Sequence, residues 1–169
     1  MKKALFYGLF VTILATQMGC FSVPHLIWPK EDVLARQVTP EATQAILIAS
    51  RESEFKEKII TTIVENYQGQ NVNIKIIGLS DVIAENPADY RAVLLINTCM
   101  SWDMDRKVHS FLKKYPDRDN IIVLTTSGDG GWLPKKKKRR FDAISSASEM
   151  TNVDQVAKEI TEKIDQLLK

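Results

Sequence analysis

Three apolar runs constrain the fold of this chain more than any other feature. They are Ala45–Ala49, Ala92–Ile96 and Ile121–Leu124, and none of them alternates with polar residues. A strand without alternation must be covered on both faces, as in a parallel sheet flanked by helices. Each run leads into a loop of small and polar residues, and in such sheets these loops gather at the carboxyl ends of the strands, where ligands bind. The fold class is therefore α/β.

Two further segments complete a predicted sheet of five strands. Asn71–Ile77 alternates and is expected nearer the sheet edge, whereas Phe141–Ile144 is a short fifth strand. Helices with one apolar face are expected at about 52–68, at 104–115, and from about 152 to the end of the chain. The alternation of strands with helices predicts a layer of helices on each face of the sheet.

The first 19 residues have the pattern of a signal peptide. Lys2 and Lys3 precede an apolar run that extends from Ala4 to Ala15, which is a charged region followed by an apolar region of signal-peptide length. This pattern predicts export of the domain that follows.

The pair Gly19-Cys20 resembles the cleavage site of bacterial lipoproteins, although Gln17 stands where that family prefers leucine. The resemblance implies that Cys20 is lipidated and becomes the mature N-terminus, with the domain on the extracytoplasmic side of the cell envelope. An uncleaved membrane anchor reaching to about Trp28 and plain secretion are the alternatives.

Residues 20–42 are predicted to be a membrane tether, and the folded domain is predicted to span 43–169. The tether segment has mixed polarity, contains Pro24, Pro29 and Pro40, and shows no clear period. A short helix is expected around Val33 to Gln37.

The charges are unevenly distributed along the chain. The net charge is +2, but outside Lys2, Lys3 and the run Lys135–Arg140 there are 15 basic and 21 acidic residues. A nucleic-acid surface would need basic residues spread over a face, so none is expected. The basic run is expected to form a solvated loop, or to contact anionic lipid headgroups if the domain is tethered to a membrane.

The two cysteines and two histidines show no metal-ligand spacing, so no metal site is expected. Cys99, at the end of a strand, is interpreted as a small buried residue because no histidine lies in a neighbouring loop. His109 lies beside the apolar face of its helix and is predicted to be a half-exposed surface residue.

The order of these elements, and two loops rich in Ser, Gly and Trp, resemble the flavodoxins over Thr43–Lys169. The resemblance implies a three-layer sandwich with a five-stranded parallel sheet of order 2-1-3-4-5 and a ligand at the junction of strands one and three. The link between strands four and five departs from the family, because it hardly has room for the helix that flavodoxins place there.

The first loop also departs from the family. Flavodoxins hold the phosphate of flavin mononucleotide (FMN) in a loop of the form Ser/Thr-x-Thr-Gly-x-Thr/Ser, and only Ser50 matches position by position. Ser53 replaces the glycine, and Glu52 and Glu54 place two carboxylates where a phosphate would lie. Each repulsive contact between one of these carboxylates and the phosphate at ~4 Å costs on the order of 1–4 kcal/mol. Arg51 offsets part of this, but phosphate binding in the usual flavodoxin manner is not expected.

Three loops are expected to converge on a pocket. Trp102 and Trp132 lie in loops that resemble those clasping the flavin ring, and aromatic faces stack on flat rings; otherwise they cover the strand ends. The candidate cofactor-binding residues come from all three loops. They are Ser50, Arg51, Ser53, Thr98, Trp102, Ser127, Gly128, Asp129, Gly130 and Trp132.

A weaker resemblance lies near the C-terminus. Asp142–Ser148 is similar to the Asp-x-x-Ser/Thr-Gly-Ala-Thr motif of exported domains with covalently attached FMN, with Ser148 at the attachment position and Ser146 in place of the glycine. The alternative is a polar lead-in to the last helix.

Two hypotheses follow. The preferred one is an exported, membrane-tethered flavodoxin-like module with a non-standard pocket, serving as a binding or accessory component. The alternative is a flavin-binding electron-transfer protein that holds FMN through Trp102 and Trp132. Neither hypothesis assigns a catalytic residue.

Overall fold

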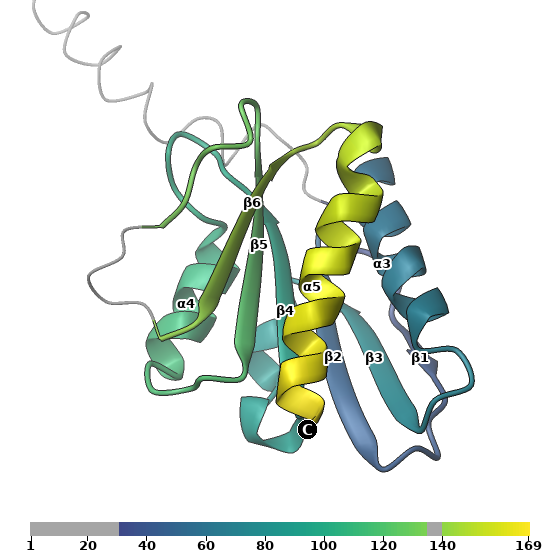
Figure 1. Ribbon diagram of the computed structural model, residues 1–169. Helices are drawn as coiled ribbons and strands as arrows, with labels where there is room; N and C mark the ends of the chain where they lie inside the picture. The colour runs from purple at the N-terminus through teal and green to yellow at the C-terminus, as the bar shows by residue number, and fades with distance from the viewer. Residues whose placement is uncertain (1–30, 135–139) are drawn as a thin grey trace, which may run out of the picture.

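The computed structural model describes residues 31–134 and 140–169, which form a sheet between two layers of helices (Figure 1). The strands are β1 (Arg36–Val38), β2 (Gln44–Ser50), β3 (Val72–Gly78), β4 (Ala92–Thr98), β5 (Ile121–Ser127) and β6 (Asp142–Ala147). The helices are α3 (Glu54–Asn66), α4 (Arg106–Lys114) and α5 (Val153–Leu168). Three short 3-10 helices are η1 (Val82–Ala84), η2 (Pro87–Asp89) and η4 (Met150–Asn152).

The sheet has the order β1-β3-β2-β4-β5-β6. The five strands from β2 onward are parallel, so their order is the 2-1-3-4-5 order implied by the flavodoxin resemblance. This confirms the flavodoxin-like α/β fold. The last strand continues to Ala147, beyond the predicted end at Ile144, because it stays in parallel register with β5 up to the pair Ser127 and Ala147.

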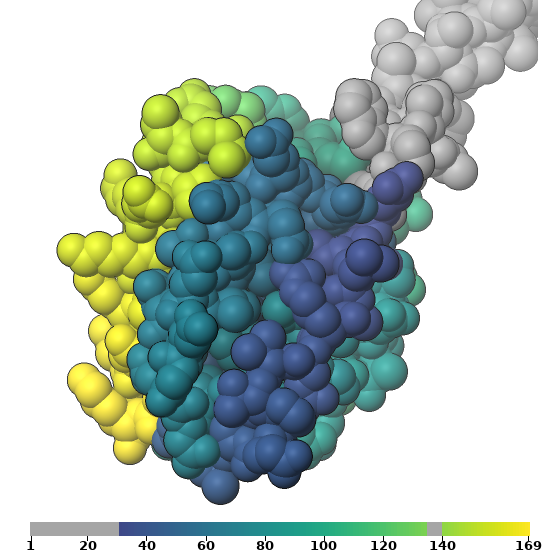
Figure 2. All heavy atoms as spheres, turned by 90° about the vertical axis from the view of Figure 1, so that its right-hand side faces the viewer, coloured from purple at the N-terminus to yellow at the C-terminus, as the bar shows by residue number. Residues whose placement is uncertain are grey.

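The predicted count of five strands is corrected to six by β1, which pairs antiparallel with β3. The helix expected around Val33 to Gln37 is wrong, because Arg36–Val38 is extended against the outer edge of β3. Val33 is buried in the core beside α3. Val33 and Arg36–Val38, which fall within the predicted tether of residues 20–42, therefore pack on the domain. Figure 2 shows this segment lying against α3.

The two faces of the sheet are covered differently (Figure 1). Helices α3 and α5 lie side by side on one face, with Ile60 and Ile160 in the core beneath them. On the other face α4 and η1 cover a smaller core that contains Phe111 and Val82. Within 128–134 and 140–141, the described parts of the link from β5 to β6, there is no helix.

Candidate functional site

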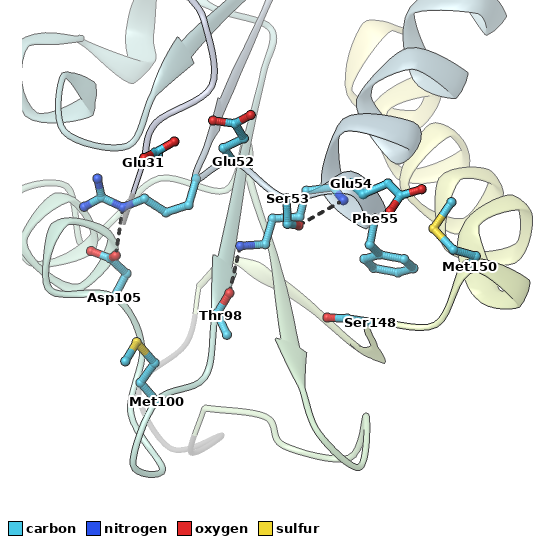
Figure 3. Close-up of a pocket in the computed structure, with 12 residues that line it drawn as sticks. Glu31, Glu52, Ser53, Glu54, Phe55, Thr98, Met100, Asp105, Ser148 and Met150 are labelled. Atoms are coloured by element: carbon cyan, nitrogen blue, oxygen red, sulfur yellow. Dashed lines mark hydrogen bonds and ion pairs between the residues drawn. The ribbon is translucent and has the colours of Figure 1, made fainter. Parts of the chain in front are cut away.

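Three loops lie at the carboxyl end of the parallel strands, as the sequence predicts. The register places Ser50 beside Ile96, and Thr98 beside Thr126, so the loops after β2, β4 and β5 start at the same end of the sheet. A cavity of about 600 Å³ opens there beside the first turn of α3 (Figure 3). Its wall consists of Glu31, Arg51, Glu52, Ser53, Glu54, Phe55, Lys56, Thr98, Met100, Asp105, Ser148 and Met150.

Lys56 is the main site residue that the sequence analysis missed. It is 3% exposed, and its Nζ donates a hydrogen bond of 2.7 Å to Thr98 Oγ1. The spacing of the apolar residues in the sequence could have identified Lys56. It lies three, four and seven residues before the buried Ile59, Ile60 and Ile63, and therefore on the same face of the helix. A lysine on the buried face of a helix is rare unless its amine has a polar partner.

Ser53 explains where this helix begins. Its side chain is the N-cap of α3 and accepts a hydrogen bond of 3.3 Å from the backbone N–H of Lys56. The cap fixes the first turn, and with it the direction in which the Lys56 side chain leaves the helix.

Arg51 lies at the centre of an ionic cluster. Its guanidinium donates to Asp32 at 2.7 Å and to Asp105 at 3.2 Å. Asp105 is 2% exposed and also caps α4 by accepting from the N–H of Lys107 at 2.8 Å. The positive charge that was expected to offset Glu52 therefore faces two carboxylates from other parts of the chain.

The backbone of the first loop is bonded within the domain. The N–H of Glu52 donates to the carbonyl of Glu31 at 2.8 Å, and the hydroxyl of the buried Ser50 donates to the carbonyl of Arg51 at 2.8 Å. Asp32 packs over Gly78 so closely that a Cβ there would lie 2.5 Å from the Asp32 side chain. A phosphate held as in flavodoxins would need loop N–H groups and hydroxyls, and the N–H of Glu52 and the hydroxyl of Ser50 are already engaged, so the loop fits that group poorly.

The loop after β4 contains a strained turn. Met100 and Asp103 exchange backbone hydrogen bonds of 3.0 and 3.1 Å around Ser101 and Trp102, which have φ values of 52° and 62°. A bulky residue in this left-handed region is an outlier. Trp102 is 78% exposed and lies outside the walls of the described cavities.

Burial raises the pKa of the neighbouring Cys99 thiol, so this thiol is not activated as a nucleophile.

The loop after β5 folds around Asp129. Its carboxylate accepts from the N–H of Gly131 at 3.1 Å and from the Ser127 hydroxyl at 3.0 Å, and these bonds hold the pKa of Asp129 below its usual value. Gly130 has a φ of 70°, and a Cβ there would lie 2.5 Å from the backbone N of Ala147. Only glycine is compatible with this close approach.

A second cavity of about 280 Å³ lies between this loop and the end of β6. Ser127 and Gly128 contribute to its wall, and it shares Thr98 and Ser148 with the larger cavity. Ser148 is exposed after the end of β6. Trp132 is half-buried and lines neither of these two cavities.

Other predicted residues lie elsewhere. His109 is exposed on α4, more so than predicted. Cys20 and Lys135–Arg139 lie outside the described residues, whereas Arg140 is exposed and pairs with Asp117 at 3.0 Å. Within 31–134 and 140–169 there is no cluster of potential metal ligands. In the same part of the chain, no helix combines the length and the apolar character needed to cross a membrane.

Comparison with solved structures shows a flavodoxin-like fold. The chain is similar to a flavodoxin from the domain Archaea, with a TM-score of 0.52 and 10% identity over 75% of this chain and 100% of the other. A short-chain flavodoxin associated with a bacterial microcompartment gives a TM-score of 0.51 and 12% identity over 76% and 99%. A flavo di-iron protein variant from Thermotoga maritima gives a TM-score of 0.52 and 13% identity, and the match covers 77% of this chain and 37% of the other. Neither a protein-family model nor a curated protein matches the chain.

Proposed function

We propose that the protein is a small-molecule binding module built on the flavodoxin-like fold, with the cavity beside α3 as its pocket. The observation that carries this proposal is Lys56, whose buried amine lies in the wall of the cavity against Thr98. A cation in a site of low dielectric attracts an anionic group far more strongly than one in water. Phe55 and Met150 supply apolar contacts in the same wall.

The ligand class follows from the charges. Glu52 and Glu54 are exposed at the pocket and repel a dianionic phosphate at the loop, whereas Lys56 is buried. The pocket is therefore suited to a ligand with one carboxylate or similar monoanion near Lys56 and an apolar body. This ligand is distinct from FMN held by its phosphate.

An experiment with benzoate and its neutral analogue benzamide tests the pocket. Benzoate should raise the melting midpoint, since a ligand at ten times its Kd adds ~1.4 kcal/mol of stability. Benzamide should have less effect, and Lys56→Met should abolish the difference while keeping the side chain's length. Equal stabilisation by both compounds, or an unchanged response in Lys56→Met, would contradict the proposal.

The alternative function, electron transfer with FMN, is favoured by one specific observation. Trp102 lies exposed in a strained turn that follows Cys99, a residue in the wall of the smaller cavity, and backbone strain often marks a binding site. The solved structures similar to this chain include flavodoxins. FMN supplies one-electron chemistry when bound, and this chain would contribute ring contacts from Trp102 and Trp132.

The absorption spectrum of the purified protein and an FMN titration separate the two functions. FMN should bind no more tightly than riboflavin, because the first loop does not fit the phosphate. The triple change Glu52→Thr, Ser53→Gly, Glu54→Asn removes two carboxylates and should strengthen FMN binding by about tenfold, or ~1.4 kcal/mol. Tight FMN binding by the unaltered protein would support electron transfer instead.

We further propose that this module is exported and lipid-anchored through Cys20, on the extracytoplasmic side of the cell envelope. The support is the charged and apolar N-terminal pattern followed by Gly19-Cys20. Cys20→Ala should release the protein from membranes or stall its processing. If the variant fractionates and migrates like the parent, an uncleaved anchor replaces this proposal.

A further inference from the structure

On the face of the sheet covered by α4, the described parts of the β5–β6 connection contribute no helix. β5 and β6 are parallel neighbours, and such strands are normally joined by a crossover that contains a helix and packs it on the sheet. Here the described parts of the connection, 128–134 and 140–141, have no helix. Within the described residues, the surface between α4 and the start of β6 therefore has no covering helix from this connection.

A groove of about 490 Å³ lies in this place. Its apolar floor is formed by Leu112 and Tyr115 from α4, Ile121 at the start of β5, and Phe141 just before β6. Leu112, Tyr115 and Phe141 are only partly buried and pack on the edge of the smaller core. The groove thus exposes apolar surface continuous with the core, as binding grooves do.

The rim of the groove is basic. Lys113, Arg118 and Arg140 line it, and among the described lining residues there is no carboxylate. Arg140 pairs with Asp117, which lies outside the lining, so Lys113 and Arg118 supply most of the positive charge of the rim. The rest of the domain has more acidic than basic residues in its sequence, so the net charge around this groove is opposite in sign to that of the domain as a whole.

Shape and charge together identify the occupant. A flat bilayer surface cannot contact the floor of a concave groove, but a helix or extended segment that presents apolar side chains can. The chain's own N-terminal segment is not complementary, because no acidic residue precedes Glu31. We propose that the groove between α4 and the start of β6 docks an acidic amphipathic segment of a partner protein. This inference is independent of the small-molecule pocket.

A labelled peptide tests the proposal with the full domain. The probe is an amphipathic helix of about 18 residues, five turns, with leucine on one face and glutamate on the other. Its binding is followed by fluorescence anisotropy at about 0.15 M salt, where surface charges are screened beyond ~8 Å. The same peptide with lysine in place of glutamate should not bind.

Two kinds of variant locate the site. The exposed pair Lys113→Glu with Arg118→Glu should weaken peptide binding by about tenfold. The matched control, Lys58→Glu with Lys158→Glu, makes the same charge change on the exposed surfaces of α3 and α5 and should leave binding unchanged. Leu112→Gln removes apolar contact and should weaken binding while the rim charges remain.

Four outcomes would overturn the proposal. The first is that the acidic peptide does not bind. The second is that the control pair, Lys58→Glu with Lys158→Glu, loses as much peptide affinity as Lys113→Glu with Arg118→Glu. The third is binding to anionic vesicles of phosphatidylglycerol and phosphatidylcholine, lost in Lys113→Glu with Arg118→Glu, without peptide binding; this would assign the surface to lipid. A dimer of the unaltered protein that the same pair dissociates would assign it to a second copy of this chain.

Discussion

The two faces of the sheet receive similar side chains from the strands but are covered to different extents. Alternate residues of β2 point to opposite sides, so that Ile46 and Ile48 join one core while Leu47 and Ala49 join the other. Among the described residues, 22 buried apolar residues form the core under α3 and α5, and 11 form the core under α4. The difference lies in the helices, because the β5–β6 connection contributes none in its described parts.

This comparison has an energetic consequence. α4 has nine residues, and only Val108 and Phe111 are fully buried along it. α5 has 16 residues and packs against α3 as well as the sheet. Elements with few buried contacts open locally at lower free energy than well-packed ones. The α4 face is therefore expected to be the weaker of the two, and it depends on a small number of anchors.

The largest expected effect comes from removing the main anchor of α4. Phe111 is fully buried and also contacts the ring of Tyr115, with ring centroids 5.0 Å apart. Phe111→Ala should reduce the free energy of unfolding by about 4 kcal/mol, measured by urea denaturation. Ile160→Ala, the matched change under α5, should cost about 3 kcal/mol. If Phe111→Ala lowers the free energy of unfolding less than Ile160→Ala does, the α4 face does not depend on this anchor as expected.

The second effect concerns the polar contacts that hold the start of α4. Asp105 is buried, caps the helix and pairs with Arg51. Asp105→Ala should cost about 3 kcal/mol, because it leaves a largely buried guanidinium with one carboxylate fewer. Asp119→Ala removes an exposed carboxylate from the loop between α4 and β5 and should change stability by less than about 0.5 kcal/mol. Similar losses in both variants would show that the ionic cluster is not needed to anchor α4.

The third effect tests the better-covered face. Tyr67 is 2% exposed, and its hydroxyl donates to Asp165 on α5 at 2.8 Å. Burial, and then the Asp165 carboxylate, raise the pKa of Tyr67. This contribution to stability is thus complete below about pH 10, the usual tyrosine pKa, and declines as the pH rises above it.

Tyr67→Phe should therefore cost about 1 kcal/mol at neutral pH, and its stability should fall less steeply than that of the unaltered protein above about pH 10. Denaturation with urea across that pH range measures both quantities. If the stabilities of the two proteins fall equally with rising pH, the contact with Asp165 on α5 does not keep Tyr67 protonated.

The smallest effect is expected from the basic run between β5 and β6. Changing Lys135 to Lys138 to serine should shift the free energy of unfolding by less than about 0.5 kcal/mol, because the run belongs to no apolar period and its charges repel one another. A thermal melt at low and high salt measures this. A large loss would mean that the run packs against the acidic body and stabilises the weaker face.

Much of the fold was readable from local pattern. The uninterrupted apolar runs of β2, β4 and β5 required cover on both faces, and the strand order followed from the flavodoxin resemblance. β1 was missed because three residues of mixed polarity carry no strand signal of their own. They are extended only because the edge of β3 offers backbone groups to pair with.

The amino-acid sequence by itself determined which loops meet at the carboxyl end of the sheet, because parallel strands place their following loops on one side. Only the tertiary structure decided which side chains meet inside the pocket. Lys56 bonds to Thr98, 42 residues away, and Arg51 pairs with Asp105, 54 residues away. Such pairs depend on the register of neighbouring strands and on the direction of each helix as it leaves its cap, and neither is encoded in a local period of the sequence.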